Sequence, residues 1–302
     1  MNSAHAYLGL FVVLSLLITS AMAEPATNGG DKHLIRHKFR DGRELRYSLS
    51  VAGRGRWDPE FRGSSGWQMS TDFRFTLSTK LIRESGACTF ELVGEKLESE
   101  LEGEEGKLKV EADRDGWEIT GEKGELEPER GNPLTREMTL TMTPRGRVRY
   151  GTRLLRLAPF FIVHVDRHFW GPLTTAPRNP VGPGDSWEKD FKLDLPDSRG
   201  RPLRVTLKTR VTGWKNYRGR RCLAGRATAE LNLKDTRVTL RNGDRLNVKN
   251  GRYQAEGTVL WDVGNGILCY ASARNRLQIQ AVDPTRRFSG QARCTLKLLD
   301  AR

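Results

Sequence analysis

Three segments of this chain alternate apolar and polar residues with the two-residue period of a β-strand. They are 44–51, 73–81 and 203–211, and each places an apolar residue at most second positions. Because successive side chains of a strand point to opposite faces, these segments predict antiparallel strands with one buried and one solvated face. Such alternation lets a chain with 37% hydrophobic and 29% charged residues still bury a core.

Turn dipeptides are spread along the chain between such segments. Asp-Gly or Asn-Gly pairs occur at 41–42, 115–116, 242–243, 250–251 and 265–266. These pairs favour two-residue hairpins, where both central positions need positive φ. The sequence therefore predicts a meander of hairpins in a mainly β fold.

One segment departs from the strand pattern. Residues 158–172 contain a non-alternating apolar run, with Pro159 near the start and Gly171 near the end, which predicts one short helix over Pro159–Trp170. A linker rich in Pro and Gly follows. The predicted organisation is a signal peptide at 1–23, an N-terminal β half at 24–157, the helix and linker at 158–183, and a C-terminal β half at 184–302.

The two β halves share a weak internal similarity. Segment 73–81 matches 203–211 in pattern, and 138–152 matches 258–272 as strand, Gly-containing turn and strand. We therefore expect two similar antiparallel β-sheet halves, forming an open half-barrel or a sandwich and joined by the short helix.

The first residues predict export. Residues 8–18 form an apolar run of 11 residues, too short to span a bilayer, and Ala21-Met22-Ala23 has the small-x-small pattern of a signal-peptide cleavage site. No later segment is apolar enough to cross a membrane. We expect a periplasmic or extracellular chain that begins near Glu24.

An exported chain can oxidise its cysteines, of which there are four. Four cysteines allow three complete pairings, and the sequence does not choose among them. Cys222, Cys269 and Cys294 lie in the C-terminal half, which favours one disulfide among these three, whereas Cys88 is expected to be a buried thiol. The absence of a C-x-x-C motif argues against zinc binding and thiol redox chemistry.

Gly184-Asp185-Ser186 resembles the nucleophile motif of one class of serine esterases. Serine hydrolysis needs a histidine base, which those esterases carry near the C-terminus, and no histidine follows His168 here. Ser186 is therefore interpreted as part of a turn before a strand. His33 with His37, and His164 with His168, have H-x-x-x-H spacing but lack the Glu of a zinc protease. We predict no catalytic residue, metal or cofactor.

Charge is distributed unevenly within a net +14. Residues 84–129 hold sixteen acidic and five basic residues, whereas 130–302 hold fourteen acidic and thirty-four basic ones. Either a basic face attracts a polyanion, or the acidic segment packs near the basic half and neutralises it. If 145–156 contains a strand, Arg145, Arg147 and Arg149 share a face suited to phosphate or sulfate. Nucleic acid is not an expected partner of an exported chain.

Five large aromatic residues lie around the predicted linker. They would line a ligand site at the junction of the halves, with ordinary core packing as the alternative. These residues are Phe160, Phe161, Phe169, Trp170 and Trp187.

The segment 179–193 resembles an uncharacterised family of secreted bacterial proteins. In that family a P-V-x-x-G-D-x-W element opens the second of two β-rich halves, and no activity is assigned to it. A more distant similarity is to the open β half-barrels of periplasmic lipoprotein and lipid carriers. The residues that match the element are Pro180, Val181, Gly184, Asp185 and Trp187.

The sequence thus favours an exported, non-catalytic envelope protein with a binding or scaffold role. Its partner would be a lipid or an anionic envelope polymer. Two alternatives stay open, a polyanion-binding surface protein that uses an Arg-rich face and a hydrolase with an unrecognised site.

Overall fold

The computed structural model describes residues 31–58, 66–103, 106–121, 132, 134, 138–150, 176–193, 203–239, 245–282 and 285–302. The predicted signal peptide and helix lie outside these ranges, as do Phe160, Phe161, Phe169 and Trp170. No described residue is α-helical. Within the same ranges there is accordingly no helix long and apolar enough to cross a membrane.

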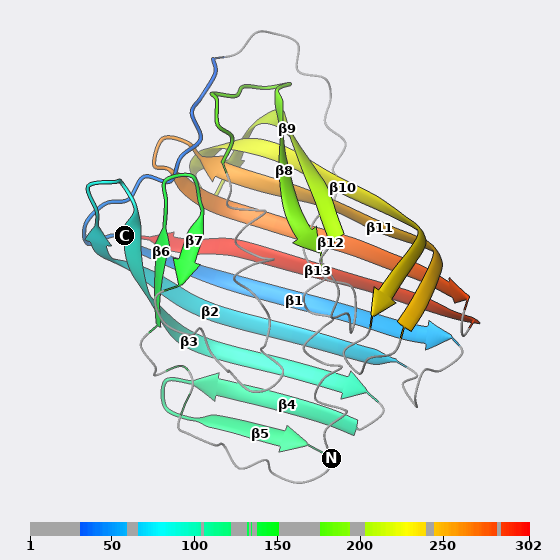
Figure 1. Cartoon of the computed structure of the whole chain (residues 1–302). Helices are drawn as coiled ribbons and strands as arrows, with labels where there is room; N and C mark the ends of the chain where they lie inside the picture. Colours follow the sequence, from blue (N-terminus) through cyan, green and yellow to red (C-terminus); the bar gives the residue numbers. More distant parts are fainter. Residues whose placement is uncertain are drawn as a thin grey trace.

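The described chain is almost entirely antiparallel β-structure, as the alternation predicted, and forms one open sheet (Figure 1). Its strands are β1 (Glu44–Asp58), β2 (Trp67–Ile82), β3 (Cys88–Gly103), β4 (Gly106–Asp113), β5 (Trp117–Gly121), β6 (Met138–Met142), β7 (Val148–Tyr150), β8 (Ser186–Leu193), β9 (Leu203–Tyr217), β10 (Arg220–Thr239), β11 (Arg245–Asp262), β12 (Ile267–Val282) and β13 (Thr285–Ala301).

The strand order places the first and last strands, β1 and β13, side by side at the centre of the sheet. It runs β5-β4-β3-β2-β1-β13-β12-β11-β10-β9-β8, with β6 and β7 attached beside β3. The N-terminal strands therefore run from the centre outward, and the C-terminal strands run from the far edge inward. Residues of both predicted halves thus belong to one sheet, and the duplication of the halves stays a prediction.

The sheet is curved (Figure 1). The core residues lie on one of its faces. Tyr47 pairs with Phe75 and Leu49 with Phe73, and all four side chains are buried. The predicted alternation is confirmed in β1, β2 and β9, where apolar side chains face inward and polar ones outward. Burying one Leu or Phe side chain contributes about 1.5–3 kcal/mol, so this face supplies most of the stabilisation.

Three of the predicted Gly-containing dipeptides lie in turns or bends, but without positive φ at both positions as the two-residue hairpin requires. Gly42 and Gly266 have φ of 67° and 66° in turns, and the 115–116 pair lies in the bend between β4 and β5. The 250–251 pair instead lies inside β11, beside a β-bulge. A Cβ at Gly251 would come 3.0 Å from Leu233 Cδ1 and 3.1 Å from the Gln278 carbonyl oxygen, so the absence of a side chain relieves crowding beside the bulge. The 242–243 pair lies outside the described residues.

One further hairpin uses an Arg-Gly dipeptide. Arg218 and Gly219 join β9 to β10 with φ of 48° and 75°. Positive φ at both central positions is the requirement of the tightest hairpins.

Two irregular segments, the one at 31–40 and the linker, contact each other and the β6–β7 turn at one end of the sheet. The segment at 31–40 pairs with the linker through a bridge between His33 and Val181, and its Ile35 is in the core. His37 N–H donates to the Pro144 carbonyl in the β6–β7 turn, at 2.8 Å. The linker is thereby held beside β6 and β7, which positions the candidate site.

Candidate anion-binding pocket

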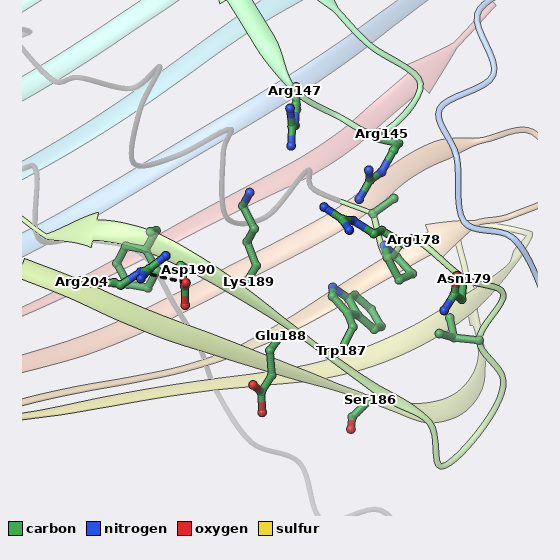
Figure 2. Close-up of a pocket in the computed structure, with 14 residues that line it drawn as sticks. Arg145, Arg147, Arg178, Asn179, Ser186, Trp187, Glu188, Lys189, Asp190 and Arg204 are labelled. Carbon is green, nitrogen blue, oxygen red and sulfur yellow. Dashed lines mark ion pairs between the residues drawn. The ribbon is translucent and has the colours of Figure 1, made fainter.

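A pocket of about 770 Å³ lies where the β6–β7 turn, the linker and the edge strand β8 meet (Figure 2). It draws on both predicted β halves and on the linker between them. Its lining residues are Arg145, Arg147, Ala176, Pro177, Arg178, Asn179, Val181, Ser186, Trp187, Glu188, Lys189, Asp190, Phe191 and Arg204.

β8 contributes a lysine on the same face as two aromatic rings. Trp187, Lys189 and Phe191 alternate with Glu188 and Asp190, and the first three are half-buried while the two acids are exposed. A turn directly before β8 fixes where the strand begins. In this turn Gly184 has φ of 92°, and Asp185 N–H donates to the Gly182 carbonyl at 3.1 Å. The predicted turn before the strand is confirmed.

The β6–β7 turn presents two arginines to the pocket. The strand, turn and strand predicted over 138–152 are present as β6, the turn and β7, so that Arg145 lies in the turn and only Arg149 of the three arginines lies in a strand. Gly146 has φ of 78° there, and the Thr143 side chain accepts from Arg147 N–H at 3.1 Å. Arg145 and Arg147 still reach one pocket, whereas the side chain of Arg149 lies outside what the structure describes.

The linker wall is fixed by a guanidinium from the N-terminal segment. Arg36 donates to the carbonyls of Pro177 at 2.7 Å and Arg178 at 2.9 Å. Ala176 N–H also donates to the Arg145 carbonyl at 3.1 Å. Burial, followed by the charge of Arg145, lowers the pKa of Arg36. We call these hydrogen bonds from Arg36 to the Pro177 and Arg178 carbonyls the Arg36 clamp. The clamp holds the Arg178 backbone in place beside the pocket.

Arg145, Arg147, Arg178 and Lys189 gather in one part of the pocket. Burial and then the charges of Arg147 and Arg145 lower the pKa of Lys189; the charge of Asp190 opposes this shift and that of Arg178 adds to it. Figure 2 shows the Lys189 amine pointing toward Arg147, and Arg145 beside Arg178. The nearby acids are engaged outside the cluster, since Asp190 pairs with Arg204 at 2.9 Å and Glu188 with Lys208 at 3.7 Å.

One nitrogen in the cluster is buried and unsatisfied. Arg145 Nε has no hydrogen-bond partner among the described residues. A desolvated donor of a charged group costs free energy until an acceptor binds it. The arrangement therefore suits a phosphate, sulfate or carboxylate, whose oxygens accept charge-assisted hydrogen bonds from guanidinium groups.

The structure combines two sites that the sequence analysis kept apart. Trp187, predicted for an apolar ligand, lines the same pocket as Arg145 and Arg147, predicted for an anion. Sequence reasoning missed Arg178 and Lys189. Lys189 had a signal, because it occupies an inward position between Trp187 and Phe191, whereas Arg178 is placed only by the tertiary clamp from Arg36.

The described histidines pack against aromatic rings. His33 meets Trp214 edge-on at 5.0 Å between ring centroids, and His37 meets Trp261 at 4.8 Å. His164 and His168 lie outside the described residues. In the part of the chain that the structure describes, no group of three His, Cys, Asp or Glu side chains could hold a metal ion.

All four cysteines are buried free thiols in this structure, as expected for Cys88. Cys222 and Cys269 share a hydrogen bond, which together with burial raises the pKa of Cys222. Burial raises the pKa of Cys294. A disulfide among Cys222, Cys269 and Cys294 stays a prediction, with Cys222 and Cys269 as the two thiols in contact.

Comparison with known proteins yields only remote similarity. No protein-family model matches the chain, and no curated protein matches it. Among solved structures, the β domain of the Bordetella autotransporter BrkA aligns at 10% identity with a TM-score of 0.23, covering 86% of this chain and 100% of that one. The translocator domain of the autotransporter NalP from Neisseria meningitidis aligns at 9% identity with a TM-score of 0.21, covering 86% and 89%. Function is therefore argued from the residues of this chain.

Proposed function

We propose that this chain is an exported, non-catalytic binding protein of the bacterial envelope whose pocket holds an anionic amphiphile. The observation that carries the proposal is the convergence of Arg145, Arg147 and Arg178 on Lys189. Like charges gathered in a partly desolvated pocket repel one another. An anionic group bound among them removes that repulsion and gains charge-assisted hydrogen bonds.

The apolar side chains that line the pocket indicate the chemistry of the rest of the ligand. Trp187 and Phe191 flank Lys189 on the inward face of β8, and Ala176, Pro177 and Val181 line the facing wall. An anionic group next to apolar surface is the pattern of a lipid headgroup joined to its acyl chain. A wholly polar anion would leave this apolar surface unused.

The envelope assignment rests on the predicted signal peptide. Export would place the mature chain, from about Glu24, where anionic lipids and anionic polymers are both present. No cofactor is needed for this role.

The test measures binding of dodecyl phosphate to the mature chain by titration calorimetry, with inorganic phosphate and dodecyl maltoside as comparison probes. We expect dodecyl phosphate to bind most tightly, because only it offers both an anion and an apolar tail. Arg145→Gln with Arg147→Gln should weaken binding by roughly 10- to 100-fold, the loss of one or two hydrogen bonds to a charged group.

The matched control removes two arginines elsewhere. Arg226 and Arg252 are exposed and paired with Glu256 and Glu230, so Arg226→Gln with Arg252→Gln changes net charge equally. Equal weakening by both pairs of substitutions, or equal affinity for dodecyl maltoside, would show the pocket assignment to be wrong.

The two alternatives from the sequence predict other results. A hydrolase would be labelled by a serine-reactive fluorophosphonate, with the labelling lost in Ser186→Ala if Ser186 were the nucleophile. A polyanion-binding surface would show steep salt dependence and no preference for an apolar tail.

A further inference from the structure

A second basic recess lies on the outward face of the sheet, where β1 ends and β13 begins. Its volume is about 950 Å³, and it crosses five neighbouring strands, β12, β13, β1, β2 and β3. With strands about 4.8 Å apart, the recess is roughly 19 Å wide. It is lined by Arg54, Gly55, Arg56, Gly66, Trp67, Gln68, Glu102, Gly103, Arg276, Gln278, Ser289, Gly290 and Gln291.

The polar side chains of this recess form continuous rows across the strands. In one row each residue is the register partner of the next, and the outward positions alternate Arg and Gln before ending on an acid. A second, shorter row lies beside it. The first row is Arg276, Gln291, Arg54, Gln68 and Glu102, and the second is Gln278, Ser289 and Arg56.

No ion pair to the arginines of the two rows is formed by the residues that the structure describes. Within the described ranges no carboxylate forms an ion pair with Arg54, Arg56 or Arg276. The next row adds Arg274 directly opposite Arg293, a like-charge pair that destabilises a sheet. An external anionic partner would turn this repulsion into attraction.

The floor of the recess is the paired backbone of β1 and β13. Gly55 pairs with Gly290, and on the inward face Trp67 lies so close that a Cβ at Gly55 would come 2.7 Å from its indole nitrogen. The glycines therefore let the indole pack flat against β1. A fixed floor holds the side-chain rows at constant spacing, which reduces the entropy lost on binding an extended chain.

We propose that this recess binds a linear anionic polysaccharide. The arginines would bind its carboxylate or sulfate groups, and the three glutamines and the serine between them would hydrogen-bond its hydroxyls. A chain of sugars offers both kinds of group along an extended path. This proposal is independent of the pocket at β8, which is lined by a different set of residues.

The experiment measures binding of the mature chain to polygalacturonate, with neutral dextran, polyphosphate, single-stranded DNA and anionic phospholipid vesicles as comparison probes. The triple variant Arg54→Gln, Arg56→Gln, Arg276→Gln should lose at least tenfold in affinity for polygalacturonate. The slope of log affinity against log salt should fall by roughly two to three, about one per lost arginine contact.

A control triple variant removes three outward arginines that have carboxylate partners. Arg46 pairs with Glu95, Arg226 with Glu256 and Arg252 with Glu230. Substituting these three with Gln keeps the charge change equal, and we expect less than a twofold loss. Equal losses in the two triple variants would overturn the site, since binding would then follow net charge alone.

The glutamines test the assignment of the ligand class. Gln278→Ala with Gln291→Ala should weaken polygalacturonate binding and leave polyphosphate binding unchanged, because only the sugar chain has hydroxyls to lose. Tighter binding of polyphosphate, DNA or vesicles than of polygalacturonate, lost in the same arginine variant, would overturn the polysaccharide assignment. Dodecyl phosphate binding at the β8 pocket should not change in any of these variants.

Discussion

Two charged regions of the sheet differ in how their charges are arranged. On β3 and β4, lysines and glutamates alternate across the outward face, and Lys96 pairs with Glu98, Lys107 with Glu100, and Lys109 with Glu111. At the β8 pocket, the charges of neighbouring arginines act on Lys189, while the acids Asp190 and Glu188 form ion pairs with Arg204 and Lys208.

The pKa directions in the two regions are opposite. On β3 and β4, hydrogen bonds from partners of opposite charge lower the pKa of Glu98 and raise the pKa of Lys107. In the pocket, burial and like charges lower the pKa of Lys189. The first region stabilises its own charged groups, and the second destabilises them until an anion arrives. We interpret the opposite pKa directions as the feature that distinguishes a binding site from a solvated surface.

The largest expected effect comes from giving the pocket the internal counter-ion that β3 and β4 already have. Phe191→Glu places a carboxylate two residues from Lys189 on the same strand face. It should abolish measurable dodecyl phosphate binding, raise the pKa of Lys189 and leave the fold intact. Calorimetry and circular dichroism measure these effects. Phe191→Gln is the control, and a comparable loss in that variant would mean that only the ring of Phe191 matters.

A smaller effect is expected at the clamp behind the pocket. Arg36→Ala removes the two hydrogen bonds to the linker carbonyls of Pro177 and Arg178. Affinity for dodecyl phosphate should fall about fivefold, an effect near 1 kcal/mol, because Arg178 is no longer held in place. Arg302→Gln, which removes an exposed arginine paired with Asp300, should change nothing. No change in Arg36→Ala would contradict the positioning role.

The lowered pKa of Lys189 predicts a pH effect whose sign can be worked out. Above its folded-state pKa the amine is neutral in the native protein but stays protonated in the unfolded chain up to about pH 10.4. The unfolded state then binds more protons, so Lys189 makes the ligand-free protein more stable as pH rises through that window. Affinity for dodecyl phosphate should fall across the same window.

The measurement compares the wild type with Lys189→Met by urea unfolding and by calorimetry as pH is raised toward 10. The difference between the two proteins isolates Lys189 from the tyrosines, which also titrate near pH 10. A stability difference that is flat with pH would show that Lys189 keeps an ordinary pKa.

The smallest effect is expected on β3 and β4. Glu100→Gln removes the partner of Lys107, which is an exposed ion pair. Such pairs contribute about 0–1 kcal/mol, so the urea midpoint should move little and ligand affinity should not change. A large loss of stability would mean that this surface matters structurally after all.

Much of the architecture could be predicted from the sequence because it depends on local pattern. The alternation in β1, β2 and β9 and the turn at Gly184 were predicted from side-chain period and turn chemistry. The dipeptide at 250–251 was misread, because an Asn-Gly pair satisfies a bulge inside β11 as well as a hairpin turn.

The candidate site was only partly predictable, for a different reason. Arg145, Arg147 and Trp187 were each singled out, but as members of separate sites. The pocket depends on the linker docking against the N-terminal segment through Arg36 and the His33–Val181 bridge, contacts between residues about 140 positions apart. Local spacing carries no information about such contacts.

By itself, the sequence determined that the chain forms antiparallel strands with one apolar face, because side-chain alternation and turn residues act within a few positions. Only the tertiary structure decided that β1 and β13 meet at the centre of one sheet, and that Arg145, Arg147 and Arg178 gather beside Lys189 in one pocket. Register and docking depend on which distant surfaces complement each other, so this placement of charge is settled only when the whole sheet assembles.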